Sequence, residues 1–481
     1  MAEKAKIIWV YALTAVFLAV NIFLVVDKHI YWFFLLPVAL VILWYYLYQL
    51  DKILLFITFF TPLAVNIQEL DLGFGVSLPT EPMMLGVTVI FLANLLLDHS
   101  KYDKRVSNHP ISYIIYMMLL WMFITSLTSE LPLVSFKYLA ARIWFVVPFY
   151  FVAVLMFKEK SNIKKFLWLY IIPLLIVIAY TISTHAKYGF DEETGHWVMS
   201  PFYNDHTAYG AALAMYFPVV VGFLFYPGLK SWQRLLVFAT MLIFVLAIIL
   251  SYSRASWLSL GAALGVFILV VFKIKFRWIL VTLLIILGLF FSFQNQILDR
   301  LEKNKTESSR NFVEHLESMT NISSDASNLE RINRWQSALR LFKERPVFGW
   351  GPGTYQFVYA PYQRSKEKTI ISTNLGDKGN AHSEYLGPLA EEGIIGTLIV
   401  LLLVGFMVYT GVAVYIKSHD REVKYLSLMV LLGLVTYFTH GFLNNFLDTD
   451  KLSVPVWGFI AILVALDVYH LTEEEKRHKI Q

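Results

Sequence analysis

The chain has 481 residues, of which 57% are hydrophobic and only 16% are Asp, Glu, Lys or Arg, and its mean hydropathy is +0.59. Soluble domains carry about 25% charged residues, so this composition indicates an integral membrane protein. The absence of cysteine excludes disulfides, thiolate metal sites and cysteine nucleophiles. The formal net charge of +5 is small, and its distribution along the chain is more informative than its size.

Apolar runs follow one another along the chain, and most are long enough to cross about 30 Å of hydrocarbon as a helix. We expect an all-α polytopic membrane protein with about twelve to fourteen transmembrane helices. The predicted spans lie near residues 7–26, 30–48, 53–67, 83–97, 111–128, 138–157, 166–184, 208–226, 232–252, 255–272, 276–293, 394–416, 425–446 and 452–469. The first run lacks a signal-peptide cleavage site and is expected to be retained.

These spans predict three parts. Residues 1–293 hold the first eleven predicted helices and an outer loop at 185–207, residues 294–390 form a large and partly helical periplasmic loop, and residues 391–481 hold the C-terminal helices. Loops longer than about 15 residues are usually functional or disordered. Within the large loop, Leu329, Ile332, Trp335, Leu339 and Phe342 recur at helical spacing, and Arg331, Arg334, Arg340 and Lys343 occupy the other face. This pattern predicts an amphipathic surface helix.

The charge of the connections predicts the orientation. DHSKYDKRVSNHP, KEKSNIKK, PGLKSWQR, KIKFR and KSHDREVK are basic, whereas QELDLGFGVSLPTEP, SELPLVSF and FLDTDKLS are not. By the positive-inside rule the basic set is cytoplasmic. Both termini are then cytoplasmic as well, and both long loops face the periplasm.

Two arginines near span ends are candidate binding residues. Arg254 lies in SYSRASW, between two predicted spans at the outer interface, where Ser253 and neighbouring hydroxyls surround it. Such a cluster of donors suits phosphate oxygens, although an arginine at a span end also fits a side chain that snorkels to the interface. Arg142 lies about one turn inside its span, where both a structural ion pair and a ligand contact remain open.

The stretch GNAHSEYLGPLAEEGIIG contains the candidate general base. A neutral imidazole, with an ordinary pKa near 6.5, can accept a proton from a hydroxyl, so His382 is a candidate. Glu384 either orients this histidine or is itself the base. The alternative is a histidine at a helix start with Glu384 placed on the helix dipole, and spacing does not decide between them. Glu391 and Glu392 are expected to be structural.

Other motifs indicate less. PVFGWGPGTYQFVYAPY lacks the Gly-Lys-Ser/Thr ending of a phosphate loop, so a tight aromatic turn is the better interpretation. His185, His196, Asp205 and His206 follow no metal-ligand spacing, and no metal site is expected. His440, inside a predicted span, is expected to be a buried structural histidine.

Four segments, taken in order, resemble the bacterial superfamily of O-antigen ligases and O-antigen polymerases. They are SPFYNDHTAYGAALAMYFP, SYSRASWLSLGAA, ERINRWQSALRLFKERPVFGWGPGTY and AHSEYLGPLAEEGIIG. The resemblance extends from about residue 195 to residue 416, and the N-terminal third is similar only as a series of spans. Ser383 departs from the family pattern, which usually has Asn after the histidine.

The resemblance implies an architecture similar to C-type membrane glycosyltransferases and an inverting transfer of a glycan from undecaprenyl diphosphate to an acceptor hydroxyl at the periplasmic face of the bacterial inner membrane. It implies that Arg254 and Arg331 hold the diphosphate and that His382 is the general base. Arg334, Arg142 and Ser253 complete the expected binding residues. The expected partners are the lipid-linked donor, an acceptor and membrane lipid, with no cofactor, metal or nucleic acid.

The acceptor remains open between a lipid A core, a growing polysaccharide and a protein. A transporter or flippase of lipid-linked glycan is the rival class, but it predicts paired repeats or broken helices at the bilayer midplane, and the sequence has neither. An envelope scaffold would leave Arg142 and Arg254 unexplained.

Overall fold

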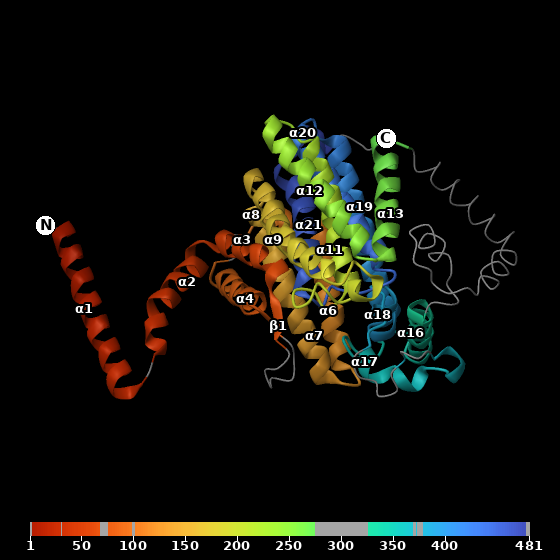
Figure 1. The fold of residues 1–481 in the computed structure, drawn as a ribbon, viewed down its shortest axis with the longest axis horizontal. Helices are drawn as coiled ribbons and strands as arrows, with labels where there is room; N and C mark the ends of the chain where they lie inside the picture. Colours follow the sequence, from red (N-terminus) through yellow and green to blue (C-terminus); the bar gives the residue numbers. More distant parts are fainter. Residues whose placement is uncertain are drawn as a thin grey trace. The chain divides into compact units, whose positions relative to one another are not determined.

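A computed structural model describes residues 2–29, 31–67, 76–98, 102–274, 326–368, 372 and 379–477 (Figure 1). The chain divides into two units, Met1–Ile53 and Leu54–Gln481. The first unit contains α1 (Ala2–Lys28) and α2 (Leu36–Tyr48), and both helices expose large apolar side chains, as a helix facing lipid does.

The second unit is a bundle of long helices. Its span-length helices are α4 (Thr80–Leu97), α6 (Pro110–Leu127), α9 (Lys160–Ala186), α11 (His206–Leu224), α12 (Ser231–Leu250), α13 (Arg254–Val271), α19 (Gly393–Lys417), α20 (Arg421–His440) and α21 (Asp450–Tyr469), and α7 (Pro132–Val146) continues through a π-helical turn (Val147–Val152) into α8 (Ala153–Met156). The shorter elements are α3 (Leu50–Phe60), α5 (Lys104–Ser107), α10 (Glu192–Gly195), α16 (Ala326–Glu344), α17 (Tyr355–Val358), α18 (Leu386–Glu391), α22 (Glu473–Arg477) and the antiparallel strands β1 (Val65–Ile67) and β2 (Val76–Leu78).

The helix count agrees with a polytopic membrane protein. Among the described residues, eleven helices are long and apolar enough to cross a membrane, and a bent pair, Phe33–Tyr48 with Leu50–Leu63, makes twelve if it counts as one span. The predicted all-α polytopic membrane fold is therefore confirmed. The predicted spans 30–48 and 53–67 correspond to the bent pair, and the predicted span 276–293 lies outside the described residues.

The core of the bundle is formed by α11, α20 and α21. The apolar windows of α20 and α21 are 83% and 89% buried inside the protein. Small residues let these helices approach closely, because a Cβ on Gly433 of α20 would lie 2.6 Å from the carbonyl oxygen of Met215 on α11. The core therefore fixes where the ends of α11, α20 and α21 meet the connecting loops.

One end of the bundle carries the basic connections. Lys160, at the start of α9, forms an ion pair of 2.5 Å with Asp420, the N-cap of α20. The ring of His470, after α21, hydrogen-bonds the carbonyl of Phe157 at 2.8 Å. The connections 157–160, 417–421 and 470–477 therefore meet at this end.

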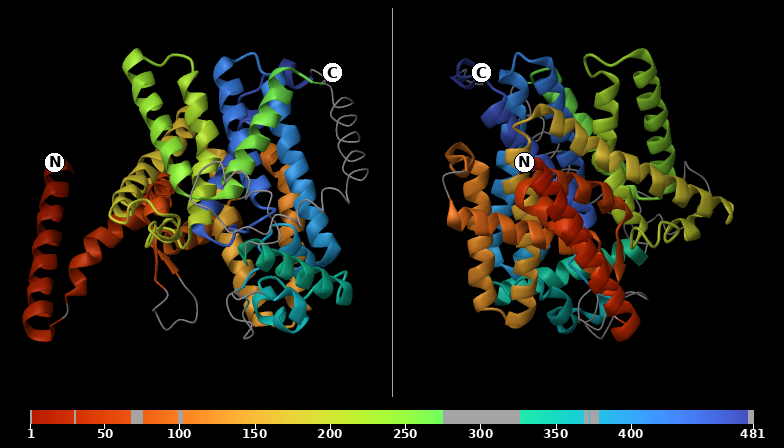
Figure 2. Two further views of the ribbon diagram at one scale, coloured as in Figure 1. Left: turned by 45° about the vertical axis from the view of Figure 1, so that its right-hand side comes forward. Right: turned by 90° about the vertical axis from the view of Figure 1, so that its left-hand side faces the viewer.

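The opposite end carries α16, α17 and α18 (Figures 1 and 2). These elements enclose a small core of their own, made of Ala338, Leu341, Trp350, Tyr355, Tyr359, Ala381 and Ala390. The described part of the predicted large loop is thus a packed structure. The three predicted domain boundaries stay a prediction.

The amphipathic helix is present as α16, but the face that packs inward differs from the apolar stripe. Its fully buried positions are Glu330, Asn333, Arg334, Ser337, Ala338 and Leu341. The predicted apolar positions are only half-buried. The reason is a buried polar network, in which Asn333 donates to Gln363 at 2.8 Å and Arg334 pairs with Glu330 at 2.8 Å.

The GWGPG stretch is a tight turn that docks the loop onto the bundle. Gly351 has φ +110°, and its N–H donates to the carbonyl of Glu391 at 2.8 Å. A Cβ on Gly351 would lie 2.0 Å from the Ser129 hydroxyl in the α6–α7 connection. Only glycine fits this position, which joins the loop, α18 and the α6–α7 connection.

Candidate functional site

Four side chains from four separate segments come together at the loop end of the bundle. Arg254 is the first residue of α13, and His206 is the first residue of α11. Arg331 lies on α16, and His382 lies between the loop and α18. We call Arg254, Arg331, His206 and His382 the arginine–histidine cluster.

His206 links the two arginines. It lies within electrostatic range of both Arg254 and Arg331. Asp205 fixes the start of α11 by accepting the backbone N–H groups of Thr207 and Ala208 at 2.7 and 2.8 Å, an ordinary N-cap. The cap therefore holds His206 at the mouth of α11, and its ring stacks on that of His196 with centroids 4.2 Å apart.

His382 sits in a specialised turn. Its φ of +47° is in the left-handed region, and its N–H donates to the Asn380 side chain at 3.1 Å. Burial, followed by the positive charges of Arg334 and Arg331, lowers the pKa of His382 to about 3. The imidazole is therefore neutral at ordinary pH and able to accept a proton.

Arg334 holds the segment that precedes His382. Its guanidinium donates to Glu330 at 2.8 Å and to the carbonyl of Asn380 at 3.1 Å, and it lies against Gly379. With 7% of its surface exposed, Arg334 has little left to offer a ligand. Its geometry is that of a positioning residue for the turn.

Glu384 is also engaged within the protein. Its Oε1 accepts the Tyr437 hydroxyl at 2.5 Å and the N–H groups of Phe446 and Leu447 at 2.7 and 3.0 Å. Its backbone N–H donates to Gly441 at 2.8 Å. Glu384 thereby ties the His382 turn to the connection between α20 and α21.

The remaining two predicted binding residues occupy other places. Ser253 is 1% exposed, its hydroxyl accepts that of Ser256 at 2.9 Å, and it packs against Gly210, so it serves the contact between α11 and α13. Arg142, 8% exposed, donates to the carbonyl of Leu447 at 2.9 Å and the Tyr138 hydroxyl at 3.0 Å. Neither joins the arginine–histidine cluster through a contact among the described residues.

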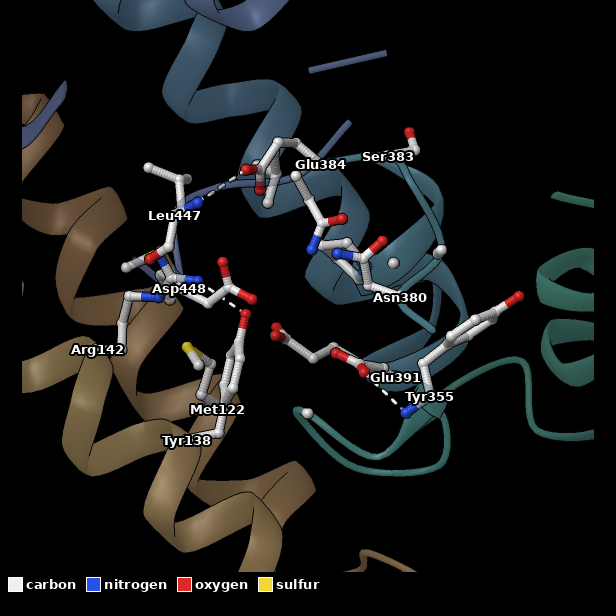
Figure 3. A pocket seen from close by; sticks show the side chains of 18 of the residues that line it. Met122, Tyr138, Arg142, Tyr355, Asn380, Ser383, Glu384, Glu391, Leu447 and Asp448 are labelled. Carbon is white, nitrogen blue, oxygen red and sulfur yellow. Dashed lines mark hydrogen bonds between the residues drawn. The ribbon is translucent and has the colours of Figure 1, made fainter. Parts of the chain in front are cut away.

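Arg142 instead lines a second feature, a cavity of about 250 Å³ that we call the acidic pocket (Figure 3). Its wall contains four carboxylates, Glu384, Glu391, Glu392 and Asp448. Burial raises the pKa of Glu391 to about 7, of Glu392 to about 8 and of Asp448 to about 6. Proximity among carboxylates adds to each of these shifts, because like charges disfavour ionisation.

The pocket adjoins the histidine turn. Ala381 and Ser383, the two neighbours of His382, both line it, as does Asn380. Across the residues described, no group of three or more His, Asp or Glu side chains is placed to hold a metal ion. The site therefore combines a cationic part, an acidic part and a turn that carries His382 between them.

Sequence reasoning missed several of these residues. His206 was weighed only as a metal ligand, and Asp448 was not singled out. His440 is 1% exposed and hydrogen-bonds Asn444 at 3.0 Å, yet it also lies within electrostatic range of Arg331 and His206. The available signal was their position at span ends on the predicted outer side.

Comparison with known proteins identifies the family. Residues 239–401 match the family described as O-antigen ligase, a region that contains Arg254, Arg331, Arg334, His382 and Glu384. The chain belongs to the O-antigen ligase superfamily. An uncharacterized protein of Haemophilus influenzae is 23% identical to it over 323 residues, which cover 65% of this chain and 76% of the relative. As a member of the O-antigen ligase superfamily, the protein is a multi-pass membrane enzyme of the glycosyltransferase type that works on lipid-linked glycans.

Proposed function

We propose that this protein transfers a glycan from an undecaprenyl-diphosphate donor to an acceptor hydroxyl, with inversion at the anomeric carbon. The observation that carries the proposal is the arginine–histidine cluster, in which Arg254 and Arg331 from distant parts of the chain lie within electrostatic range of one histidine, His206. Two guanidinium groups suit a diphosphate, which offers several oxygens for paired hydrogen bonds.

In the proposed step, the acceptor hydroxyl oxygen attacks the anomeric carbon of the donor sugar. A new carbon–oxygen bond forms while the bond from the anomeric carbon to the phosphate oxygen breaks, and its electron pair leaves with the diphosphate. Arg254 and Arg331 stabilise the charge that grows on the leaving group. The acceptor proton passes to His382 and then to solvent, so the step requires no separate acid.

The electrostatics of His382 support a coupling between donor binding and base strength. In the free enzyme, burial and the neighbouring arginines hold its pKa near 3. A bound diphosphate would offset the charge of those arginines, so the pKa would rise toward its ordinary value. The imidazole would then become a stronger base only when the donor is in place.

The proposed location is the bacterial inner membrane, with both termini in the cytoplasm and the site facing the periplasm. Lys160 and other basic connections gather at the end of the bundle away from α16, α17 and α18, as the positive-inside rule expects of a cytoplasmic face. A polysaccharide polymerase of the same superfamily is the second candidate, because it would need the same donor chemistry. A transporter of lipid-linked glycan would leave a neutral histidine between arginines without a role.

The test uses the purified full-length protein in proteoliposomes with a lipid-diphosphate-linked glycan and an acceptor. We expect Arg254→Ala and Arg331→Ala to weaken donor binding and to lower transfer by about 10²-fold or more. His382→Ala should abolish transfer while donor binding persists. Arg234→Ala, which removes an exposed arginine at the other end of α12, is the matched control. Normal transfer by the His382→Ala protein would sink the proposal.

A further inference from the structure

The acidic pocket has no task in holding the diphosphate. Its wall carries four carboxylates and one cation, Arg142, which is already bonded to Leu447 and Tyr138. Such a surface repels a diphosphate by Coulomb interaction at close range. A different part of a substrate must therefore occupy the space beside the His382 turn.

Unpartnered polar atoms in the wall indicate what that part is. Trp457 is 1% exposed and lines the pocket, and its indole N–H has no hydrogen-bond partner among the described residues. Asn445 also lines it, and its side-chain oxygen likewise has no acceptor role filled in the described structure. One is a donor and the other an acceptor, so the missing group both accepts and donates hydrogen bonds.

The carboxylates fit the same kind of group. Figure 3 shows the side chains of Glu384, Glu391 and Asp448 around one space, with Tyr138 and Arg142 at its edge. Buried carboxylates whose pKa is near neutrality are partly protonated, so they donate as well as accept. A purely cationic ligand would use only acceptors.

Size and polarity narrow the class further. The volume of about 250 Å³ corresponds to about eight water molecules at liquid density, which suits one sugar ring and not a longer chain. Met118, Met122 and Phe438 supply apolar wall against which the carbon face of a ring can lie. A hydroxyl-rich ring with an apolar face matches each of these features.

We propose that the acidic pocket binds one uncharged sugar ring of the acceptor glycan and presents its hydroxyl to His382. The pocket is lined by both neighbours of His382, so a ring held there lies next to the base. This inference rests on the proposed function and deepens it. It makes the acceptor a carbohydrate, whether on lipid or on a growing polysaccharide, and not a protein side chain.

The experiment measures sugar binding directly, without turnover. Full-length protein in lipid nanodiscs is titrated with methyl glucoside, methyl galactoside and methyl mannoside while tryptophan fluorescence is followed. We expect a saturable change with at least one sugar. Trp457→Phe should remove the signal, and Glu391→Gln should weaken binding at least tenfold. Glu474→Gln, an exposed carboxylate on α22, is the matched control and should change nothing.

A second measurement guards against variants that fail to fold. Wild-type protein is treated with a carbodiimide with and without the sugar, and modification of Glu391 and Glu392 is read by peptide mass spectrometry. Protection of these two residues, with Glu474 unprotected, supports the subsite. No saturable signal with any of the sugars, or binding of spermidine in place of a sugar, overturns it.

The outcomes also separate the two proposals. Sugar binding that persists in Arg331→Ala, together with loss of lipid-diphosphate binding, supports both the pocket and the arginine site. Sugar binding in a protein that never binds a lipid diphosphate sinks the proposed function and leaves a carbohydrate site. Donor binding without sugar binding or protection overturns the pocket alone.

Discussion

Arg334 donates a hydrogen bond of 3.1 Å from its guanidinium to the backbone carbonyl of Asn380, two residues before His382. The same guanidinium is fixed by Glu330 at 2.8 Å and lies 5.5 Å from the centre of the Tyr359 ring. An arginine held from three sides thus sets the path of the turn that presents the candidate base. The packed α16 and the transfer site are coupled through this contact.

Arg334→Lys is expected to separate positioning from charge. Lysine keeps the positive charge but lacks the planar fork that reaches Glu330 and Asn380 together. We expect transfer to fall by about tenfold to a hundredfold, since small misplacement of a reacting group has effects of that size. The affinity for the donor should stay unchanged, so kcat falls and KM does not rise. Arg340→Lys, which alters the neighbouring pair with Glu367, is the control. An equal rise in donor KM would instead place Arg334 among the ligand-binding residues.

Much of the fold was predictable from the sequence, because hydropathy reports directly on burial in lipid. The helices from α4 to α13 and from α19 to α21 match predicted spans, and the periodicity in residues 329–342 predicted α16. The packed face of α16 was not predictable in this way. It depends on partners such as Gln363 for Asn333, which lie elsewhere in the chain.

The candidate site was predictable only in part, and the resemblance to the ligase family did most of it. Spacing alone could not join Arg254, Arg331 and His382, because they lie in separate connections. The acidic pocket had even less signal, since Glu391 and Asp448 each resemble an ordinary residue at a span end. Their proximity comes from the packing of α18 against the connection between α20 and α21.

Arg331→Ala is expected to change the pH dependence of the reaction. Arg331 is one of the cations that hold the pKa of His382 near 3, so its removal should raise that pKa toward 6.5. The variant then protonates its base at a higher pH than the wild type does, and its activity declines earlier as the pH falls. The test is the pH profile of kcat/KM for the donor, which reports on the free enzyme. Arg234→Ala should keep the wild-type profile, and an acid limb that stays in place or moves lower would contradict the prediction.

Glu392→Gln should stabilise the protein at alkaline pH. The pKa of Glu392 is raised from 4.5 to about 8, so its contribution to stability is fully present below 4.5 and is lost as the pH rises through about 8. Glutamine cannot ionise, so the variant escapes this loss. We expect its Tm to exceed that of the wild type above pH 8 and to match it near pH 4.5. The readout is thermal unfolding in detergent across this range, with Glu474→Gln as the exposed control. A Tm difference that is independent of pH would mean that Glu392 is not the titrating group.

Glu384→Gln and Glu384→Ala together decide whether Glu384 acts as an anchor or as a base. The glutamine oxygen can still accept the N–H groups of Phe446 and Leu447, so an anchor role predicts that Glu384→Gln folds and keeps most of its activity. Alanine leaves both N–H groups without an acceptor, at about 1–3 kcal/mol each, so Glu384→Ala should lose thermal stability and activity together.

The decisive comparison is therefore between activity and Tm in the glutamine variant. Complete loss of transfer in Glu384→Gln, with wild-type Tm and wild-type donor binding, would assign proton removal to Glu384 and leave His382 to orient it. Retained transfer in Glu384→Gln beside a dead His382→Gln places the base at His382. The three hydrogen bonds already accepted by Glu384 favour that second result, because each of them stabilises the carboxylate and makes it a weaker base.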